Sequence, residues 1–184
     1  MTSYTDPGQH FFWIASRAFG VVGLVLIALS VGFGIAISAR ASNEPAYMRQ
    51  VHEATALAGL IAIGLHAALL VGDSYLRPGI AGVTVPFVIA TTRIWTALGV
   101  IAAWLAAILG LSFYARKWIG MQRWRRMHRW SLAVYVLGIG HAIGSGTDGL
   151  SLWLIAIIVA TGIPVVLMAF YRYMPSQEPA PGRT

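Results

Sequence analysis

The sequence predicts an all-α fold, a polytopic transmembrane helical bundle with about five spans. Of its 184 residues, 58% are hydrophobic and only 10% are charged, and the mean hydropathy is +0.71. Several apolar runs reach the length of about 18 residues that a helix needs to cross a bilayer. They lack the alternation of a membrane β-strand. Because only helices and closed barrels satisfy backbone polar groups in lipid, a helical bundle is expected.

The five expected spans follow one another between short polar segments. The first contains one charge, Arg17, and the second is the run "HEATALAGLIAIGLH" with its flanks. The third and fourth are separated by a strongly basic segment, and the fifth follows the turn-forming "GSGTDG". The expected spans are 12–38, 51–71, 94–114, 128–143 and 150–171. Together they form one membrane domain, 12–173, between two tails, 1–11 and 174–184.

The positive charges indicate the orientation of the bundle. The net charge is +7 and the pI is near 10.4, but most cations flank apolar runs, which favours a topological role over nucleic-acid binding. By the positive-inside rule, the side with the basic segment is cytoplasmic, so the N-terminus is expected outside and the C-terminus inside. The cations on that side are Arg40, Arg49, Arg116, Lys117, Arg123, Arg125, Arg126, Arg129 and Arg172.

Four histidines mark the ends of the second and fourth spans. His52 and His66 are 14 positions apart, and His128 and His141 are 13 apart, which corresponds to a rise of about 20 Å in each helix. Both spans run from inside to outside, so the histidines fall at two matched depths. Imidazole is a common axial ligand of haem iron, and bundle cores hold such cofactors. We therefore expect two b-type haems with bis-histidine ligation, His52 with His128 and His66 with His141.

Two observations qualify this prediction. Thirteen residues of an ideal straight helix leave His128 and His141 about 140° apart around the axis. Tilt, a different ring position or a distortion near Gly138 and Gly140 has to compensate. Small residues near the histidines leave space for a flat ligand, although small residues also serve ordinary packing of membrane helices. His10 has no partner at the right depth and is expected to lie at the interface.

This pattern resembles the ferric reductase-like transmembrane domain, the family of NADPH oxidases, ferric reductases and the haem subunit of methionine sulfoxide reductase systems. The resemblance lies in the two histidine pairs, in "WRRMHRWSLAVYVLGIGHA" and in "ASRAFGVVGLVLIALSVGFG". It implies a protein of the bacterial cytoplasmic membrane that carries electrons through two haems to an outer acceptor: a ferric chelate, oxygen or a partner protein. It also implies that Arg17 lies near a haem propionate; snorkelling of Arg17 to the interface is the alternative. Arg49, Arg126 and Arg129 could likewise meet propionates, though a plain topological role is favoured for each.

The sequence departs from the family in two respects. Six helices are usual in the larger members, whereas five spans are expected here, with the first one missing. No glycine-rich phosphate-binding motif or flavin domain follows the fifth span. The electron donor is therefore expected to be separate, either a flavoprotein reductase or a quinol. Whether the chain is an oxidoreductase in its own right is left open.

The sequence is also compatible with two other functions. The chain could be a non-catalytic haem-binding anchor subunit of a larger complex, or a transporter with histidine proton relays. The relay is disfavoured because carboxylates are scarce within the spans. Asp148, close to the outer histidine level, is a possible cation ligand, although a simple turn also explains it.

Overall fold

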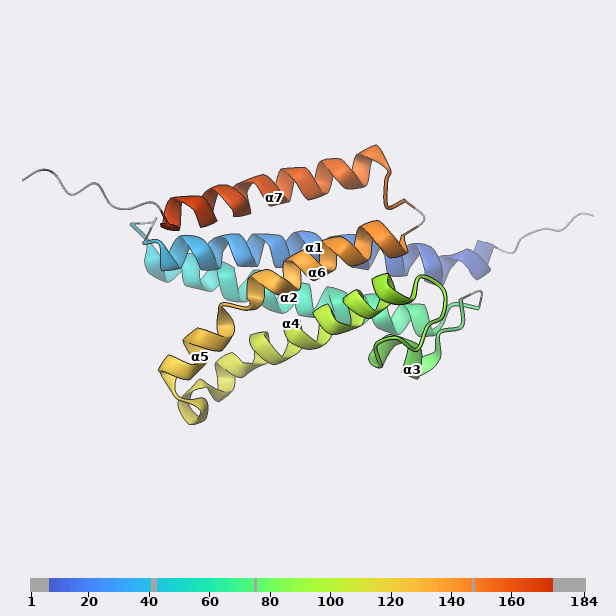
Figure 1. Ribbon diagram of the computed structural model, residues 1–184, viewed down its shortest axis with the longest axis horizontal. Coiled ribbons are helices and arrows are strands. Elements are labelled where there is room, and N and C mark those ends of the chain that lie inside the picture. Colours follow the sequence, from blue (N-terminus) through green and yellow to red (C-terminus); the bar gives the residue numbers. More distant parts are fainter. Residues whose placement is uncertain (1–6, 41–42, 75, 147, 174–184) are drawn as a thin grey trace, which may run out of the picture.

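The computed structural model describes residues 7–40, 43–74, 76–146 and 148–173, and these fold into helices joined by short turns. The start of α1 and the end of α7 lie at opposite ends of an elongated bundle (Figure 1). The helices are α1 Pro7–Ser38, α2 Pro45–Val71, α3 Gly79–Thr84, α4 Arg93–Ile119, α5 Met121–His128, α6 Ser131–Ser145 and α7 Leu152–Tyr173.

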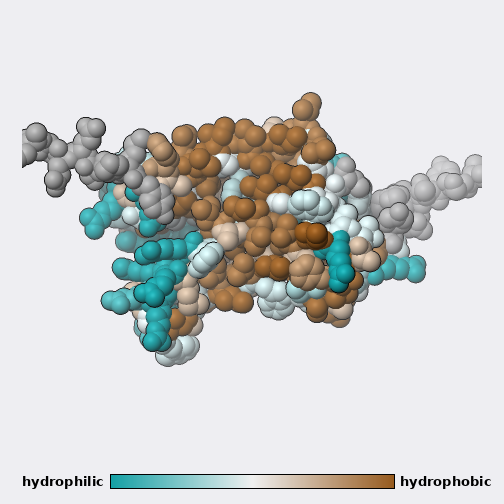
Figure 2. All heavy atoms as spheres, in the orientation of Figure 1, coloured by the Kyte–Doolittle hydropathy of each residue, from teal (hydrophilic) through white to brown (hydrophobic). Residues whose placement is uncertain are grey.

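Within the described residues, four helices are long and apolar enough to cross a membrane. They are Phe11–Ser38, Pro45–Val71, Arg93–Ile119 and Leu152–Arg172. These helices mark the chain as an integral membrane protein. Large apolar side chains such as Ile61, Ile108 and Val166 point outwards and are more than half exposed. Figure 2 shows the resulting apolar band, with hydrophilic residues gathered towards the ends of the molecule.

The fourth expected span, 128–143, differs most from the prediction. The structure places its apolar part in α6, which has 15 residues and a length of about 22 Å, less than the hydrocarbon thickness of about 30 Å. His128 belongs to a separate basic helix, α5. Figure 1 shows that α6 nevertheless runs from the α5 end of the bundle towards the opposite end. The first helix begins at Pro7, earlier than the expected residue 12.

The long helices pack as two close pairs. Helix α1 lies along α2, and α4 lies along α6, while contacts between the pairs are sparser and α7 covers α1. Glycines allow the close approach within the α1–α2 pair. A Cβ atom on Gly59 would lie 3.0 Å from Ile27, and one on Gly23 would lie 3.2 Å from Ile63. This agrees with the general use of small residues where membrane helices meet.

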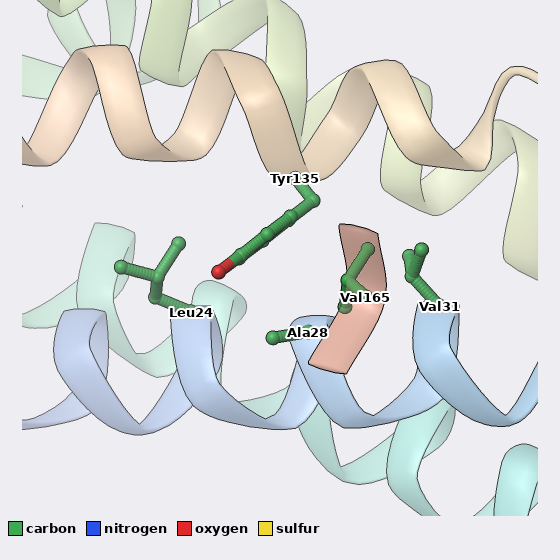
Figure 3. Packing of buried hydrophobic residues seen from close by; sticks show 5 residues of the cluster. All are labelled: Leu24, Ala28, Val31, Tyr135 and Val165. Carbon is green, nitrogen blue, oxygen red and sulfur yellow. The ribbon is translucent and has the colours of Figure 1, made fainter. Parts of the chain in front are cut away.

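A buried cluster joins α1, α6 and α7 near the middle of the bundle. Tyr135 of α6 is only 3% exposed and points between Leu24 and Ala28 of α1, as Figure 3 shows. Its hydroxyl group is 2.8 Å from the Thr161 hydroxyl group, so the buried polar group has a partner. The cluster thereby fixes α7 and α6 on the same face of α1.

Candidate functional site

The four predicted histidines lie in two pairs, each formed across the bundle. The ring centroids of His52 and His128 are 6.0 Å apart, with planes at 86°. Those of His66 and His141 are 6.1 Å apart, with planes at 75°. These are the pairs expected from the sequence, and they are separated by about 20 Å along α2.

Three of the four imidazoles are held by backbone carbonyl groups. Nδ1 of His52 is 2.8 Å from the Ser30 oxygen, Nδ1 of His66 is 2.7 Å from the Ser16 oxygen, and Nδ1 of His141 is 2.9 Å from the Trp95 oxygen. A carbonyl oxygen can only accept a hydrogen bond, so Nδ1 carries the proton in each ring. In the neutral form, the Nε2 lone pair of these three histidines is then free to bind a metal.

The two α2 histidines are held by a second bond from the same serines. The Ser16 hydroxyl donates to the His66 backbone carbonyl over 2.9 Å, and the Ser30 hydroxyl donates to the His52 carbonyl over 3.3 Å. Ser16 is 1% exposed and Ser30 5%. These two serines are not among the site residues predicted from the sequence. The available signal was their spacing of 14 positions, equal to the spacing of His52 and His66 on the antiparallel neighbour.

A glycine follows each accepting carbonyl by four residues. Gly20 follows Ser16, Gly34 follows Ser30, and Gly99 follows Trp95. A Cβ atom would lie 3.0 Å from His66 at the first position, 3.2 Å from His52 at the second and 2.5 Å from His141 at the third. In a helix the carbonyl of residue i points towards the N–H of residue i+4. A missing side chain at i+4 therefore opens that oxygen to a second donor from a neighbouring helix.

His128 is the exception. Its Nδ1 is buried and has no hydrogen-bond partner among the described residues. The Leu109 backbone, 14 positions after Trp95, faces it, but the residue four positions later is Phe113 rather than glycine. The Leu109 carbonyl instead accepts the Ser112 hydroxyl over 2.7 Å. The His128 ring stacks on Trp124, whose indole N–H donates to Ser112 over 3.2 Å.

A break between α5 and α6 lies within the 13-residue interval that separates His128 from His141. The helix is interrupted at Arg129 and Trp130, where Trp130 N–H donates to the Met127 carbonyl and Ala133 N–H to the Trp130 carbonyl. Such i to i+3 bonds wind the backbone more tightly than an α-helix. The distortion therefore lies at 129–130 and not near Gly138 and Gly140, which are inside α6.

An apolar layer separates the two histidine levels. It includes Ala106 and Leu109 of α4 and Val134 of α6, all buried, with Ile27 of α1 and Leu60 of α2 packed against them. Side chains from all four central helices thus fill the space between the levels. Such a layer excludes water and lowers the dielectric constant around each pair.

Arg17 forms an ion pair with Asp148, and its guanidinium group lies 4.3 Å from the centre of the Trp13 ring. Both charged side chains are about one-third exposed, 32% and 33%. The pair joins α1 to the α6–α7 connection at the end of the bundle that holds His66 and His141. Each residue is therefore the partner of the other in this structure, and both predicted roles, propionate binding and cation binding, stay predictions.

No protein-family model, curated protein or solved structure matches the chain.

The donor set restricts what the two pairs can bind. Among the described residues, no group of three or more His, Cys, Asp or Glu side chains is placed to hold a metal ion. A zinc site normally needs three or four protein ligands, and each pair supplies two. Haem iron needs only the two axial ligands, because its macrocycle supplies the others. The three other arginines that the resemblance offers as propionate partners, Arg49, Arg126 and Arg129, have exposed side chains.

Proposed function

We propose that this chain is a transmembrane electron carrier that holds two b-type haems, one between His52 and His128 and one between His66 and His141. The observation that supports it most is the separation of the paired imidazoles, 6.0 and 6.1 Å between ring centroids. With two metal–nitrogen bonds of about 2 Å and ring centres about 1 Å beyond each nitrogen, two axial imidazoles would be centred about 6 Å apart.

The hydrogen bonds support the same proposal. Metal-bound histidines usually donate their second ring N–H to a carbonyl or carboxylate group, which fixes the tautomer and the ring orientation. His52, His66 and His141 make such bonds to backbone carbonyl groups. The same bonds leave Nε2 without the proton in these three rings, as an axial ligand would require. At each level, at least one histidine therefore has the supporting hydrogen bond that an axial ligand would use.

The protein would supply ligation, burial and distance, while the haems would supply reversible one-electron chemistry. His52 and His128 would hold the site at the α5 end, and His66 and His141 the site at the other end. The buried layer around Leu60, Ala106 and Val134 would keep water away from the path between them. The rise of about 20 Å between the two histidine levels would leave about 10 Å between haem edges, a gap that an electron would cross without side-chain chemistry.

The orientation follows from the distribution of charge. The cations of α5 and the end of α4 would lie on the cytoplasmic side, with Arg17 and Asp148 outside. Five crossings, with α6 as the short fourth, fit the position of the start of α1 and the end of α7 at opposite ends (Figure 1). The location would be a cytoplasmic membrane of bacterial type.

Electrons would enter from a separate donor, a reduced flavoprotein or a quinol, and leave to an outer acceptor. Each transfer oxidises the donor by one electron and reduces the acceptor by one, so a two-electron donor serves two successive transfers. The acceptor would be a ferric chelate, oxygen or a partner protein. The alternative is a haem-binding anchor subunit that transfers no electrons across the membrane.

The first test is the haem content of the purified protein, by pyridine haemochrome and reduced-minus-oxidised spectra. We expect two b-type haems per chain, and one after His52→Ala or His66→Ala. His128→Ala should remove the same spectral component as His52→Ala. His10→Ala is the matched control and should retain both. A protein without haem, or with one haem that none of these changes removes, would overturn the proposal.

A second test separates electron transfer from anchoring. In sealed vesicles, an impermeant reductant supplied on the α5 side should reduce both haems and then an impermeant ferric chelate on the other side. His66→Ala should stop reduction of the chelate while the haem at His52 and His128 is still reduced. Two haems that exchange no electrons across the membrane would favour the anchor subunit instead.

A further inference from the structure

The α2 histidines are each held at two points by one buried serine of α1, which the haem ligation itself does not require. We propose that Ser16 and Ser30 are positioning residues that set the ring orientation and the electron-donating strength of His66 and His52. This inference rests on the proposed function, since its readouts are properties of the haems. It assigns one serine to each haem.

The serine and the histidine are joined by reciprocal hydrogen bonds on both levels. In one direction, the histidine Nδ1–H donates to the serine backbone carbonyl; in the other, the serine hydroxyl donates to the histidine backbone carbonyl. The serine Oγ also lies 3.0 Å from Nδ1 of His66 and 3.1 Å from Nδ1 of His52. Each serine thus contacts both the ring and the main chain of its histidine, which leaves the ring little freedom to rotate.

The serine hydroxyl groups are not explained by helix formation alone. A serine inside a membrane helix commonly donates to a carbonyl of its own helix one turn earlier, as Ser38 does to Ile35 over 2.8 Å. Ser16 and Ser30 instead donate across to α2. Gly20 and Gly34 leave the space that lets the imidazole approach that closely. Serine, glycine and histidine therefore recur as one unit at both depths.

The same contacts affect the iron ligand electronically. A histidine whose Nδ1–H is strongly hydrogen-bonded gains basicity at Nε2 and donates more charge to a bound metal. More donation stabilises ferric over ferrous iron and lowers the reduction potential. Loss of the Oγ contact, with the backbone carbonyl retained, should therefore raise the potential of the haem on that level only.

The experiment is a redox titration of the wild-type protein and of Ser16→Ala and Ser30→Ala, with optical and electron paramagnetic resonance spectra. Ser30→Ala should shift the midpoint potential of the His52–His128 haem to a more positive value and change its ferric spectrum. Ser16→Ala should do the same for the His66–His141 haem. Ser16→Thr and Ser30→Thr, which keep the hydroxyl group, should restore values close to wild type. Ser38→Ala is the control on the same helix and should change neither haem.

Several outcomes would overturn the inference. Two bound haems with unchanged potentials and spectra in both alanine variants would leave the proposed function intact and remove the serine role. Equal shifts of both haems, or loss of stability that threonine does not restore, would indicate packing alone. A wild-type protein without haem would remove the proposed function together with this inference.

Discussion

His128 stacks on Trp124 with ring centroids 4.9 Å apart and planes 23° from parallel, and this stack takes the place of the hydrogen bond that the other three histidines make. The ring is held from its face rather than through Nδ1. The site at the α5 end therefore depends on an aromatic stack, and the described residues show no such stack on His66 or His141.

Replacement of Trp124 should weaken that site selectively. Trp124→Leu removes the stack and the indole donor to Ser112, so His128 loses its main orientation contact. We expect a haem content that falls from two towards one per chain, with the His66–His141 haem retained, as measured by haemochrome assay. Trp118→Leu is the matched control, because Trp118 is 89% exposed. Equal loss of both haems in Trp124→Leu would contradict this view.

A methyl group at position 99 should disrupt the other site. In Gly99→Ala the new Cβ would lie 2.5 Å from Nδ1 of His141, so the ring or the α4–α6 spacing must shift. Overpacking of this kind typically costs about 1–3 kcal/mol. We expect loss of the His66–His141 haem in the reduced spectrum. Gly64→Ala is the control and should retain both haems, because a Cβ atom there meets nothing within 4 Å. Retention of both haems in Gly99→Ala would show that the close approach of the His141 ring to α4 is not required.

The ring planes predict an unusual ferric signal. At angles of 86° and 75°, the two imidazoles of each pair would donate into different iron π orbitals, which leaves those orbitals nearly equal in energy. We expect two strongly anisotropic low-spin signals in the electron paramagnetic resonance spectrum of the oxidised protein. Signals typical of parallel imidazole planes would show that the rings turn when haem binds.

The absence of cysteine makes the orientation directly measurable. Gln122→Cys at the start of α5 should react with an impermeant thiol reagent only from the cytoplasmic side. Ile80→Cys in α3, where the side chain is 73% exposed, should react from the outside in intact cells. The reverse pattern would invert the proposed direction of the two haem sites. Unmodified protein provides a background free of reactive thiols.

The ion pair between Arg17 and Asp148 should contribute modestly to stability. Partly exposed pairs are worth about 0.2–1 kcal/mol, and the two side chains here are about one-third exposed. In a double-mutant cycle with Arg17→Gln and Asp148→Asn, we expect a coupling energy in that range from thermal unfolding in detergent. Additive effects would mean that the pair does not form in solution. A change in the potential of one haem in Arg17→Gln alone would support the predicted propionate contact.

The sequence predicted the elements whose signal is local. Long apolar runs predict helices irrespective of their neighbours, and equal depths of His52 with His128 and of His66 with His141 follow from helical rise. The helix break at Arg129 and Trp130 was not predicted, because both residues have ordinary helical propensity. The interruption arises where a strongly charged helix meets an apolar one.

The supporting groups were harder to predict. Ser16 and Ser30 are unremarkable in a membrane helix until α2 is placed antiparallel to α1, and only then does their equal spacing with the histidines acquire meaning. The Arg17–Asp148 contact joins residues far apart in the chain. Backbone acceptors such as the Trp95 carbonyl carry no side-chain signal at all; the glycine four residues later is the only trace in the sequence.

The shortness of α6 has a consequence for the lipid around the protein. A helix of about 22 Å reaches both interfaces only if the bilayer thins locally; otherwise the α5–α6 junction lies within the hydrocarbon region and the end of α5 completes the crossing. In either arrangement, hydrophobic mismatch acts on His128 more than on the other three histidines. Acyl-chain length would then set how much water reaches the ring, so the same protein would have different properties in thin and in thick membranes.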